Sequence, residues 1–82
     1  MPVVLRVKGY RFWFYESDLN EPPHVHVGKE DDEAKFWLAP VSLTRVHGFR
    51  SHQLREIERI ISQYHDDLLA SWKQEVEKRG YR

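Results

Sequence analysis

The 82-residue sequence contains no cysteine, so neither disulfide bonds nor thiolate metal ligands can form. Its 13 basic and 13 acidic side chains give a formal net charge of zero, which argues against a general nucleic-acid coat or an acidic tail but leaves room for a local basic patch. No apolar run approaches the roughly 18 residues of a membrane span, and no signal segment opens the chain. These absences predict a soluble cytoplasmic protein with no membrane partner.

Large aromatic side chains are what the sequence has in abundance. Three Trp, four Tyr and four Phe supply much of the apolar volume of a chain long enough for one small domain. No internal repeat, low-complexity segment or domain boundary interrupts the chain. Residues 1–82 are therefore expected to form a single domain, with strands over about 3–46 and a helical part over about 51–79.

Alternating and β-branched apolar residues predict an antiparallel β-meander of about four to five strands. The strands are expected at 3–7, 10–15, 24 to about 29, 34–38 and 41–46. Lys8-Gly9 is expected to form the tight turn between the first two. In the last strand, Val41, Leu43 and Arg45 alternate and are expected to share one side.

The acidic stretch after the third strand sets the predicted strand register. A turn centred on residues 31–32 would place His26 beside Trp37, with Lys35 within diagonal reach on the same face. The same register would make two apolar pairs on the core side, Val27 with Phe36 and Val25 with Leu38.

Beyond residue 50 the apolar residues recur at steps of three and four, which is the spacing of an amphipathic helix. They are Leu54, Ile57, Ile61, Tyr64, Leu68, Trp72 and Val76. Ser51 is expected to cap the start and Gly80 to follow the end. The pattern leaves open one long helix or two short ones that break near 65–67. This stripe is expected to cover one sheet face in an α+β fold, over Val25, Val27, Phe36 and Leu38.

The stretch from Asn20 to Val27 is the strongest candidate for a site. Pro22 and Pro23 restrict the backbone that enters it. Residues two apart in a strand share a face, so the side chains of His24 and His26 are expected to lie together. Two imidazoles that titrate near neutral pH can take a proton from a nucleophile and give one to a leaving group.

One hypothesis for this stretch is a metal-independent ribonuclease site. Lys35, with Arg6 or Arg11, would hold a phosphate beside the two histidines. RNA supplies its own nucleophile, the 2′-hydroxyl, so neither serine nor cysteine is needed. An exposed Trp37 or Trp13 could stack a base. No cofactor is expected.

Other interpretations of the same residues stay open. The two histidines could bind a metal ion with a third ligand from Asp18, Glu21 or His47. They could equally lie on an ordinary polar strand face, with Trp37 packed on His26. A basic run near the start of the helical part could meet an acidic partner or a phosphate backbone, through Arg45, Arg50, Arg55 and Arg59.

A series of short motifs runs through nearly the whole chain. They are Leu5-Arg6, Gly9-Tyr10-Arg11-Phe12, Glu21-Pro22-Pro23-His24-Val25-His26-Val27, Ala34-Lys35-Phe36-Trp37-Leu38 with Pro40, Gly48-Phe49 and Trp72. In this order the chain resembles a family of small bacterial proteins known as a domain of unknown function. The resemblance implies a component of a toxin–antitoxin pair, because members tend to be encoded beside another short protein thought to be the partner. It carries over Glu21, His24, His26, Lys35 and Trp37 as motif positions.

The leading functional hypothesis is a toxin-like component of a bacterial toxin–antitoxin pair that acts on RNA. His24 and His26 would be the acid–base pair and Lys35 the phosphate holder, with Glu21, Trp37, Arg6 and Arg11 at the substrate. The alternative is a non-enzymatic protein- or nucleic-acid-binding module, and a further alternative is a small metal-binding protein. Zero net charge argues against strong nonspecific affinity for RNA. The expected partners are a small antitoxin-like protein, RNA, and a second copy of the chain in a homodimer.

Overall fold

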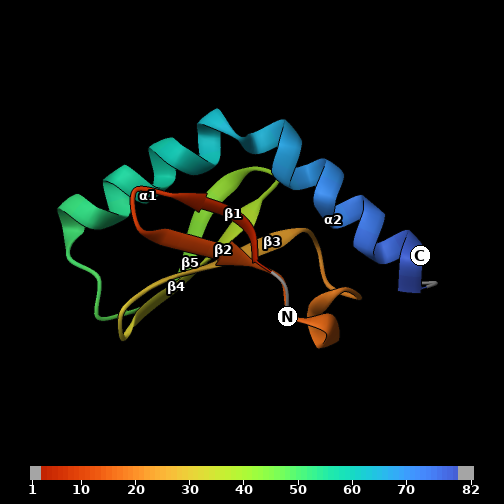
Figure 1. The fold of residues 1–82 in the computed structure, drawn as a ribbon, viewed down its shortest axis with the longest axis horizontal. Coiled ribbons are helices and arrows are strands. Elements are labelled where there is room, and N and C mark those ends of the chain that lie inside the picture. The colour runs from red at the N-terminus through yellow and green to blue at the C-terminus, as the bar shows by residue number, and fades with distance from the viewer. Residues whose placement is uncertain (1–2, 80–82) are drawn as a thin grey trace.

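The computed structural model describes residues 3–79, apart from the side chain of Asp18, as a five-stranded antiparallel sheet with helices across one face (Figure 1). The elements in chain order are β1 (Val3–Val7), β2 (Tyr10–Trp13), the short 3-10 helix η1 (Glu16–Asp18), β3 (His24–Lys29), β4 (Asp32–Leu38), β5 (Val41–His47), α1 (Ser51–Gln63) and α2 (His65–Arg79). The predicted α+β fold, a β-meander followed by a helical part, is confirmed.

Each strand pairs with its neighbour in the sequence, in the order β1-β2-β3-β4-β5. The turn between β1 and β2 is Lys8-Gly9, as predicted, and both residues have positive φ, 53° and 84°. Two residues with positive φ match the right-handed twist of the strands that they join. The sheet therefore has β1 at one edge and β5 at the other.

The register of β3 and β4 differs from the predicted one by two residues. The turn lies at residues 30–31, with Glu30 at a positive φ of 55°. The observed pairs are Val25 with Phe36, Val27 with Ala34, and His24 with Trp37. His26 consequently lies opposite Lys35 rather than beside Trp37. A slip of two keeps every side chain on its face, so the hydrophobic pattern alone does not distinguish the two registers.

A β-bulge in β5 reverses the predicted side of one arginine. Leu43 lies opposite Phe36, whereas Arg45 lies opposite Lys35, and the register shift between these pairs leaves Thr44 as the extra residue. An extra residue in one strand changes the alternation beyond it. The prediction that Arg45 shares a side with Leu43 was wrong for this reason.

The helical part consists of two helices. They meet at Tyr64, whose φ of −103° and ψ of 21° depart from helical values. The cap of α1 is Arg50 rather than Ser51, and its backbone N–H donates a hydrogen bond of 2.9 Å to Oε1 of Gln53. The predicted residue after the helix, Gly80, lies outside the described residues.

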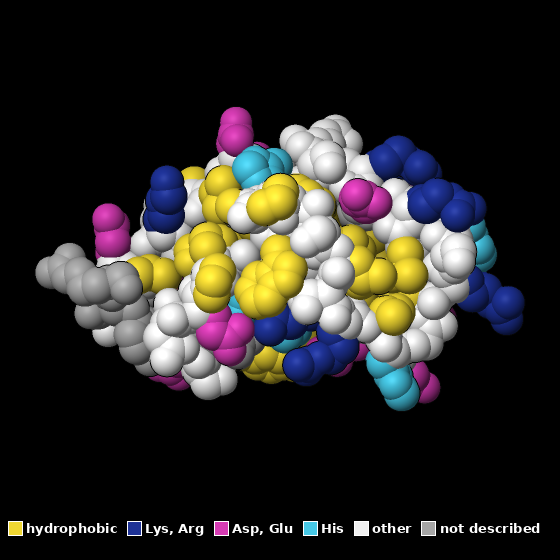
Figure 2. Space-filling model, turned by 180° about the vertical axis from the view of Figure 1, so that it is seen from behind, with side chains coloured by type: hydrophobic (Ala, Val, Ile, Leu, Met, Phe, Trp, Pro, Cys, Tyr) yellow, Lys and Arg dark blue, Asp and Glu magenta, His cyan; other side chains and the backbone are white. Residues whose placement is uncertain are grey.

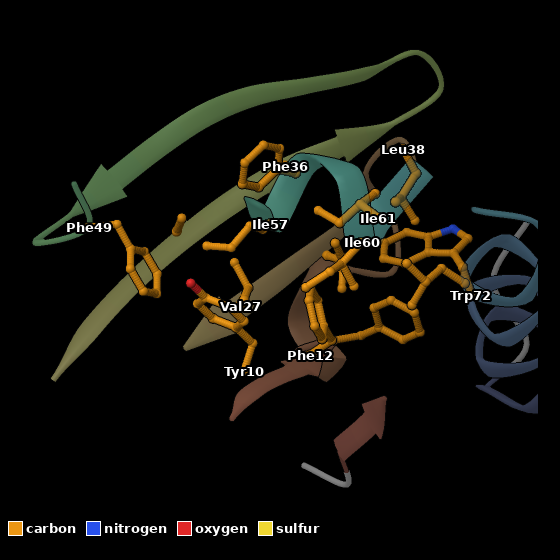
Figure 3. Packing of buried hydrophobic residues seen from close by; sticks show 14 of the residues in the cluster. Tyr10, Phe12, Val27, Phe36, Leu38, Phe49, Ile57, Ile60, Ile61 and Trp72 are labelled. Atoms are coloured by element: carbon orange, nitrogen blue, oxygen red, sulfur yellow. The ribbon is translucent and has the colours of Figure 1, made fainter. Parts of the chain in front are cut away.

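The core lies between the sheet and the two helices (Figure 3). The strands contribute Tyr10, Phe12, Val25, Val27, Phe36 and Leu38, the segment after β2 contributes Phe14, and the helices contribute Ile57, Ile60, Ile61, Leu68 and Trp72. The predicted helical stripe thus covers the predicted sheet face. His65 donates a hydrogen bond from Nε2 to the carbonyl oxygen of Leu38, which ties the start of α2 to the end of β4. No helix within residues 3–79 is long and apolar enough to cross a membrane.

Candidate functional site

The sheet face away from the core carries a row of side chains from four adjacent strands. Trp13 pairs with His26, His26 pairs with Lys35, and Lys35 pairs with Arg45. Neighbouring strands lie about 4.8 Å apart, so the row from His26 to Arg45 spans roughly 10 Å. The bulge at Thr44 is what allows Arg45 to join this row while Leu43 remains on the helix side.

A cavity of about 340 Å³ opens along this row. It combines two imidazoles, two basic side chains, a phenol and three carboxylates, from His26, His47, Lys35, Arg45, Tyr15, Glu21, Asp31 and Glu33. Three of the residues predicted for the site therefore meet here, His26, Lys35 and Glu21.

His26 is held by ring contacts at the wall of the cavity. Its side chain is largely buried, with 7% of the residue exposed. The imidazole stacks on Trp13, with centroids 5.9 Å apart and planes 20° apart, and meets Tyr15 edge to face at 4.5 Å. Its Nδ1 lies 3.9 Å from Oε2 of Glu33, so a carboxylate borders the ring on the cavity side.

His24 lies two residues before His26 in β3 and does not line the cavity. It is fully buried, in ring contact with Trp37, Trp72 and His26 at centroid distances of 5.6, 5.0 and 5.3 Å. Its Nδ1 lies 3.0 Å from the carbonyl oxygen of Pro22. Because a carbonyl oxygen only accepts, Nδ1 carries the proton and donates. The buried ring packs edge to face against that of His26.

Lys35 links the histidine motif to the cavity. Its Nζ lies 3.3 Å from Oε1 of Glu21 and 4.8 Å above the ring of Trp37. The same carboxylate oxygen of Glu21 lies 3.8 Å from Nδ1 of His24. Trp37 itself borders a separate hollow of about 180 Å³, so the ring predicted to stack a base lies outside the main cavity.

The two arginines predicted at the substrate lie on other strands. Arg6 and Arg11 pair with each other across β1 and β2, and neither lines the main cavity. Arg11 extends over Gly28 together with Trp13. A Cβ at Gly28 would lie 2.9 Å from Cη2 of Trp13 and 3.2 Å from Nη2 of Arg11, so the glycine leaves room for both side chains. The predicted substrate-binding set is thus divided among three places: Glu21 lines the main cavity, Trp37 borders the smaller hollow, and the two arginines lie on β1 and β2.

Five polar or charged cavity residues were missed as catalytic or substrate-binding candidates, among them Asp31, which was considered only as part of the acidic turn. Arg45 was considered only as part of a basic run, and its position depends on a bulge that no local motif indicates. His47 was considered only as a metal ligand. Tyr15 lies just beyond the end of β2, and Glu33 was assigned to the acidic turn that the structure places earlier. The Tyr10 to Tyr15 alternation was the only signal that placed Tyr15 on this face.

The described residues hold no group of three or more His, Asp or Glu side chains arranged to bind a metal ion. Of the three candidate third ligands, Glu21 lies at 3.8 Å from His24 and His47 lines the cavity. Asp18, the remaining candidate, has a side chain outside the described set.

The cavity has the groups needed to bind an oxyanion and to transfer protons. Arg45 is exposed, and a guanidinium can donate two parallel hydrogen bonds to a phosphate. Lys35 supplies a second positive charge next to it in the ladder. His26 and His47 provide two imidazoles around the same space.

Comparison with known proteins places the chain in a family. Neither curated proteins nor solved structures give a significant match. A family model described as "Domain of unknown function (DUF4160)" matches residues 9–73, a range that contains β2 to β5, α1 and every cavity residue named above. Since the match spans most of its length, this chain belongs to the DUF4160 family of domains of unknown function.

Proposed function

We propose that the chain is the toxin-like component of a bacterial toxin–antitoxin pair and that it acts as a metal-independent ribonuclease. The observation that carries the proposal is the row of His26, Lys35 and Arg45 along one cavity. The resemblance of the sequence motifs to proteins encoded beside a short partner supports the cellular role.

In the proposed reaction, His26 removes the proton from the 2′-hydroxyl of RNA, and the resulting oxygen attacks the adjacent phosphorus. The bond from phosphorus to the 5′-oxygen breaks, and His47 protonates that oxygen. The products are a 2′,3′-cyclic phosphate and a 5′-hydroxyl. Lys35 and Arg45 stabilise the negative charge on the phosphate oxygens as the bond breaks.

Two further residues support this assignment of roles. Tyr15, 39% exposed and in edge contact with His26, is placed to stack a base next to the scissile bond. His24 is a positioning residue here, because its buried ring contacts His26 and does not reach the cavity. The acid–base pair proposed from the structure is therefore His26 with His47, in place of His26 with His24.

The test combines RNA cleavage in a chelator with growth on induced expression. Wild-type protein should leave cyclic phosphate ends and arrest growth, and His26→Gln should lower cleavage by about a hundredfold or more. His52→Gln is the matched control, because His52 is exposed on α1 and does not line the cavity. Cleavage by His26→Gln equal to that of the wild type, or no cleavage by the wild type, overturns the ribonuclease assignment.

A second candidate function, a non-enzymatic binding module, is favoured by apolar side chains exposed on β5. Growth arrest that persists in folded His26→Gln protein would select this function instead. Circular dichroism and matched soluble levels guard against a simple loss of folding.

A further inference from the structure

The outer edge of β5 is open. β5 is the last strand in the sheet order, and no strand within residues 3–79 lies beyond it. A seven-residue edge strand presents backbone N–H and C=O groups that can pair with another chain. Edge strands are usually protected by charged side chains, and Arg45 is the only Lys, Arg, Asp or Glu in β5.

Apolar side chains are exposed along this edge. Three large hydrophobic residues of the described chain are exposed, and two of them lie on β5, Leu43 at 42% and Val46 at 43%. Figure 2, which views the molecule from behind, shows hydrophobic side chains open to solvent across this side. The helices leave these two positions only partly covered, although they lie opposite core residues in the ladder.

Four arginines lie on or near the edge. Arg45 lies on β5 and Arg50 lies between β5 and α1, both exposed. Arg55 and Arg59 are exposed on α1 and line a hollow with Glu58, Ser62 and Gln63. Ser62 and Gln63 also line a hollow with Val41 of β5, so this side of α1 faces the strand; the start of α2 adds His65, Asp66 and Asp67 to that hollow, at the end of β5 away from the arginines. Figure 2 shows Lys and Arg side chains grouped at the end of the molecule where α1 begins.

We propose that the outer edge of β5 accepts an added strand from a partner protein, and that this strand is an extended acidic segment with alternating apolar residues. The strand edge would supply the main-chain hydrogen bonds. Leu43 and Val46 would contact the apolar side chains of the segment, and the four arginines would attract its carboxylates.

Charge and side-chain type argue for this occupant over two others. A second copy paired through β5 would bring the same arginines together, and like charges across a strand pair are destabilising. Single-stranded RNA binds with aromatic stacking, whereas the large hydrophobic side chains exposed on β5 are aliphatic. The proposal goes beyond the ribonuclease function and does not depend on it.

The test is a titration followed by backbone amide NMR of the full chain. The probe is a synthetic peptide of alternating valine and glutamate as long as β5, and the control replaces glutamate with lysine. We expect saturable shifts of the β5 amides with the glutamate peptide and affinity lower by about tenfold or more with the lysine peptide. Leu43→Lys/Val46→Lys should lower the affinity by a similar factor, and Arg55→Glu/Arg59→Glu should reverse the preference between peptides.

Several outcomes would overturn the proposal. Shifts confined to β1, the other sheet edge, or equal binding of both peptides would remove the basis for a specific acidic strand. Concentration-dependent dimers that Leu43→Lys/Val46→Lys abolishes would assign the edge to a second copy. A single-stranded RNA oligomer that shifts the β5 amides when the glutamate peptide does not would assign it to RNA. Because every variant lies outside the proposed catalytic residues, RNA cleavage can be scored separately.

Discussion

The imidazole of His24 and the indole of Trp72 pack against each other, with centroids 5.0 Å apart and planes inclined by 53°. Trp72 also meets Phe14 edge to face at 5.2 Å. The arrangement follows from α2, which passes the end of the sheet where β3 begins (Figure 1). A residue of the C-terminal helix thus fixes a residue of the histidine motif.

Replacing Trp72 by alanine should reduce stability and loosen the motif together. The indole is 4% exposed, so its removal leaves a large cavity and should cost about 3–5 kcal/mol in the free energy of unfolding. Urea unfolding followed by circular dichroism measures this. Trp72→Phe, which keeps an aromatic ring, should lose much less. A loss below about 1 kcal/mol for Trp72→Ala would show that the packing against His24 contributes little.

Gly28→Ala should disturb the stack between Trp13 and His26. The added Cβ would lie 2.9 Å from Cη2 and 3.0 Å from Cζ3 of Trp13, closer than atoms approach without a shift. Overpacking of this kind costs about 1–3 kcal/mol. Urea unfolding measures the loss of stability, and near-ultraviolet circular dichroism reports the displaced indole.

A double-mutant cycle separates this clash from a backbone effect. If the clash with the indole is the cause, Gly28→Ala should cost much less in a Trp13→Ala background. An unchanged cost in that background would place the cause in the strand itself.

Tyr10→Phe should remove a decrease in the free energy of unfolding that the wild type shows at alkaline pH. Burial, and then the hydrogen bond of 2.9 Å that the hydroxyl donates to Glu56, raise the pKa of Tyr10 from 10.0 to about 12. Above pH 10.0 the unfolded chain loses this proton before the folded one, so wild-type stability should fall as pH rises to about 12. Unfolding free energies measured across this range should lack this decrease in Tyr10→Phe.

The same substitution has an acid-side consequence. The hydrogen bond from Tyr10 is the main cause that lowers the pKa of Glu56 below 4.5, with the positive charge of Lys8 adding to it. The stability that the carboxylate contributes is therefore present above pH 4.5 and is lost as pH falls through the folded pKa. Tyr10→Phe should reduce this loss of stability at acidic pH. A wild-type free energy of unfolding that does not fall at acidic pH would contradict the role given to the hydrogen bond between Tyr10 and Glu56.

Deleting Thr44 should be tolerated. Its removal turns the bulge into a regular ladder and leaves Arg45 opposite Lys35, so the free energy of unfolding should change by no more than about 1 kcal/mol. Deleting Ser42 is the matched control, because it also regularises the ladder but moves Leu43 to the polar face. We expect the Ser42 deletion to be clearly the less stable in urea unfolding, and equal losses would show that the bulge itself is required.

The sequence predicted the architecture because periodicity reports which face each residue occupies. The alternation in β3 and the three- and four-residue steps in α1 and α2 placed Val25, Val27, Ile57 and Trp72 in the core, as found. Periodicity does not distinguish two registers that differ by two residues. The turn lies at 30–31 rather than 31–32, and His26 therefore has Lys35 as its partner instead of Trp37.

The candidate site was predicted less completely than the fold. His24 and His26 alternate with valines, so both were expected together on the polar face of the strand. The alternation does not indicate that α2 covers the end of that strand at His24. Arg45 reaches the cavity through one extra residue in β5. The first feature depends on a contact between distant parts of the chain and the second on an irregularity in strand pairing, and the local pattern encodes neither.

The meander has a consequence for synthesis on the ribosome. Because every strand pairs with the strand before it, the sheet needs only local contacts and can form as soon as β5 has emerged. Its apolar face, with Phe12, Val27 and Phe36, then stays open to water until α1 and α2 follow. A nascent chain that stalls after His47 would expose that face, and a chaperone that binds apolar surface would recognise it until the helices close over the sheet.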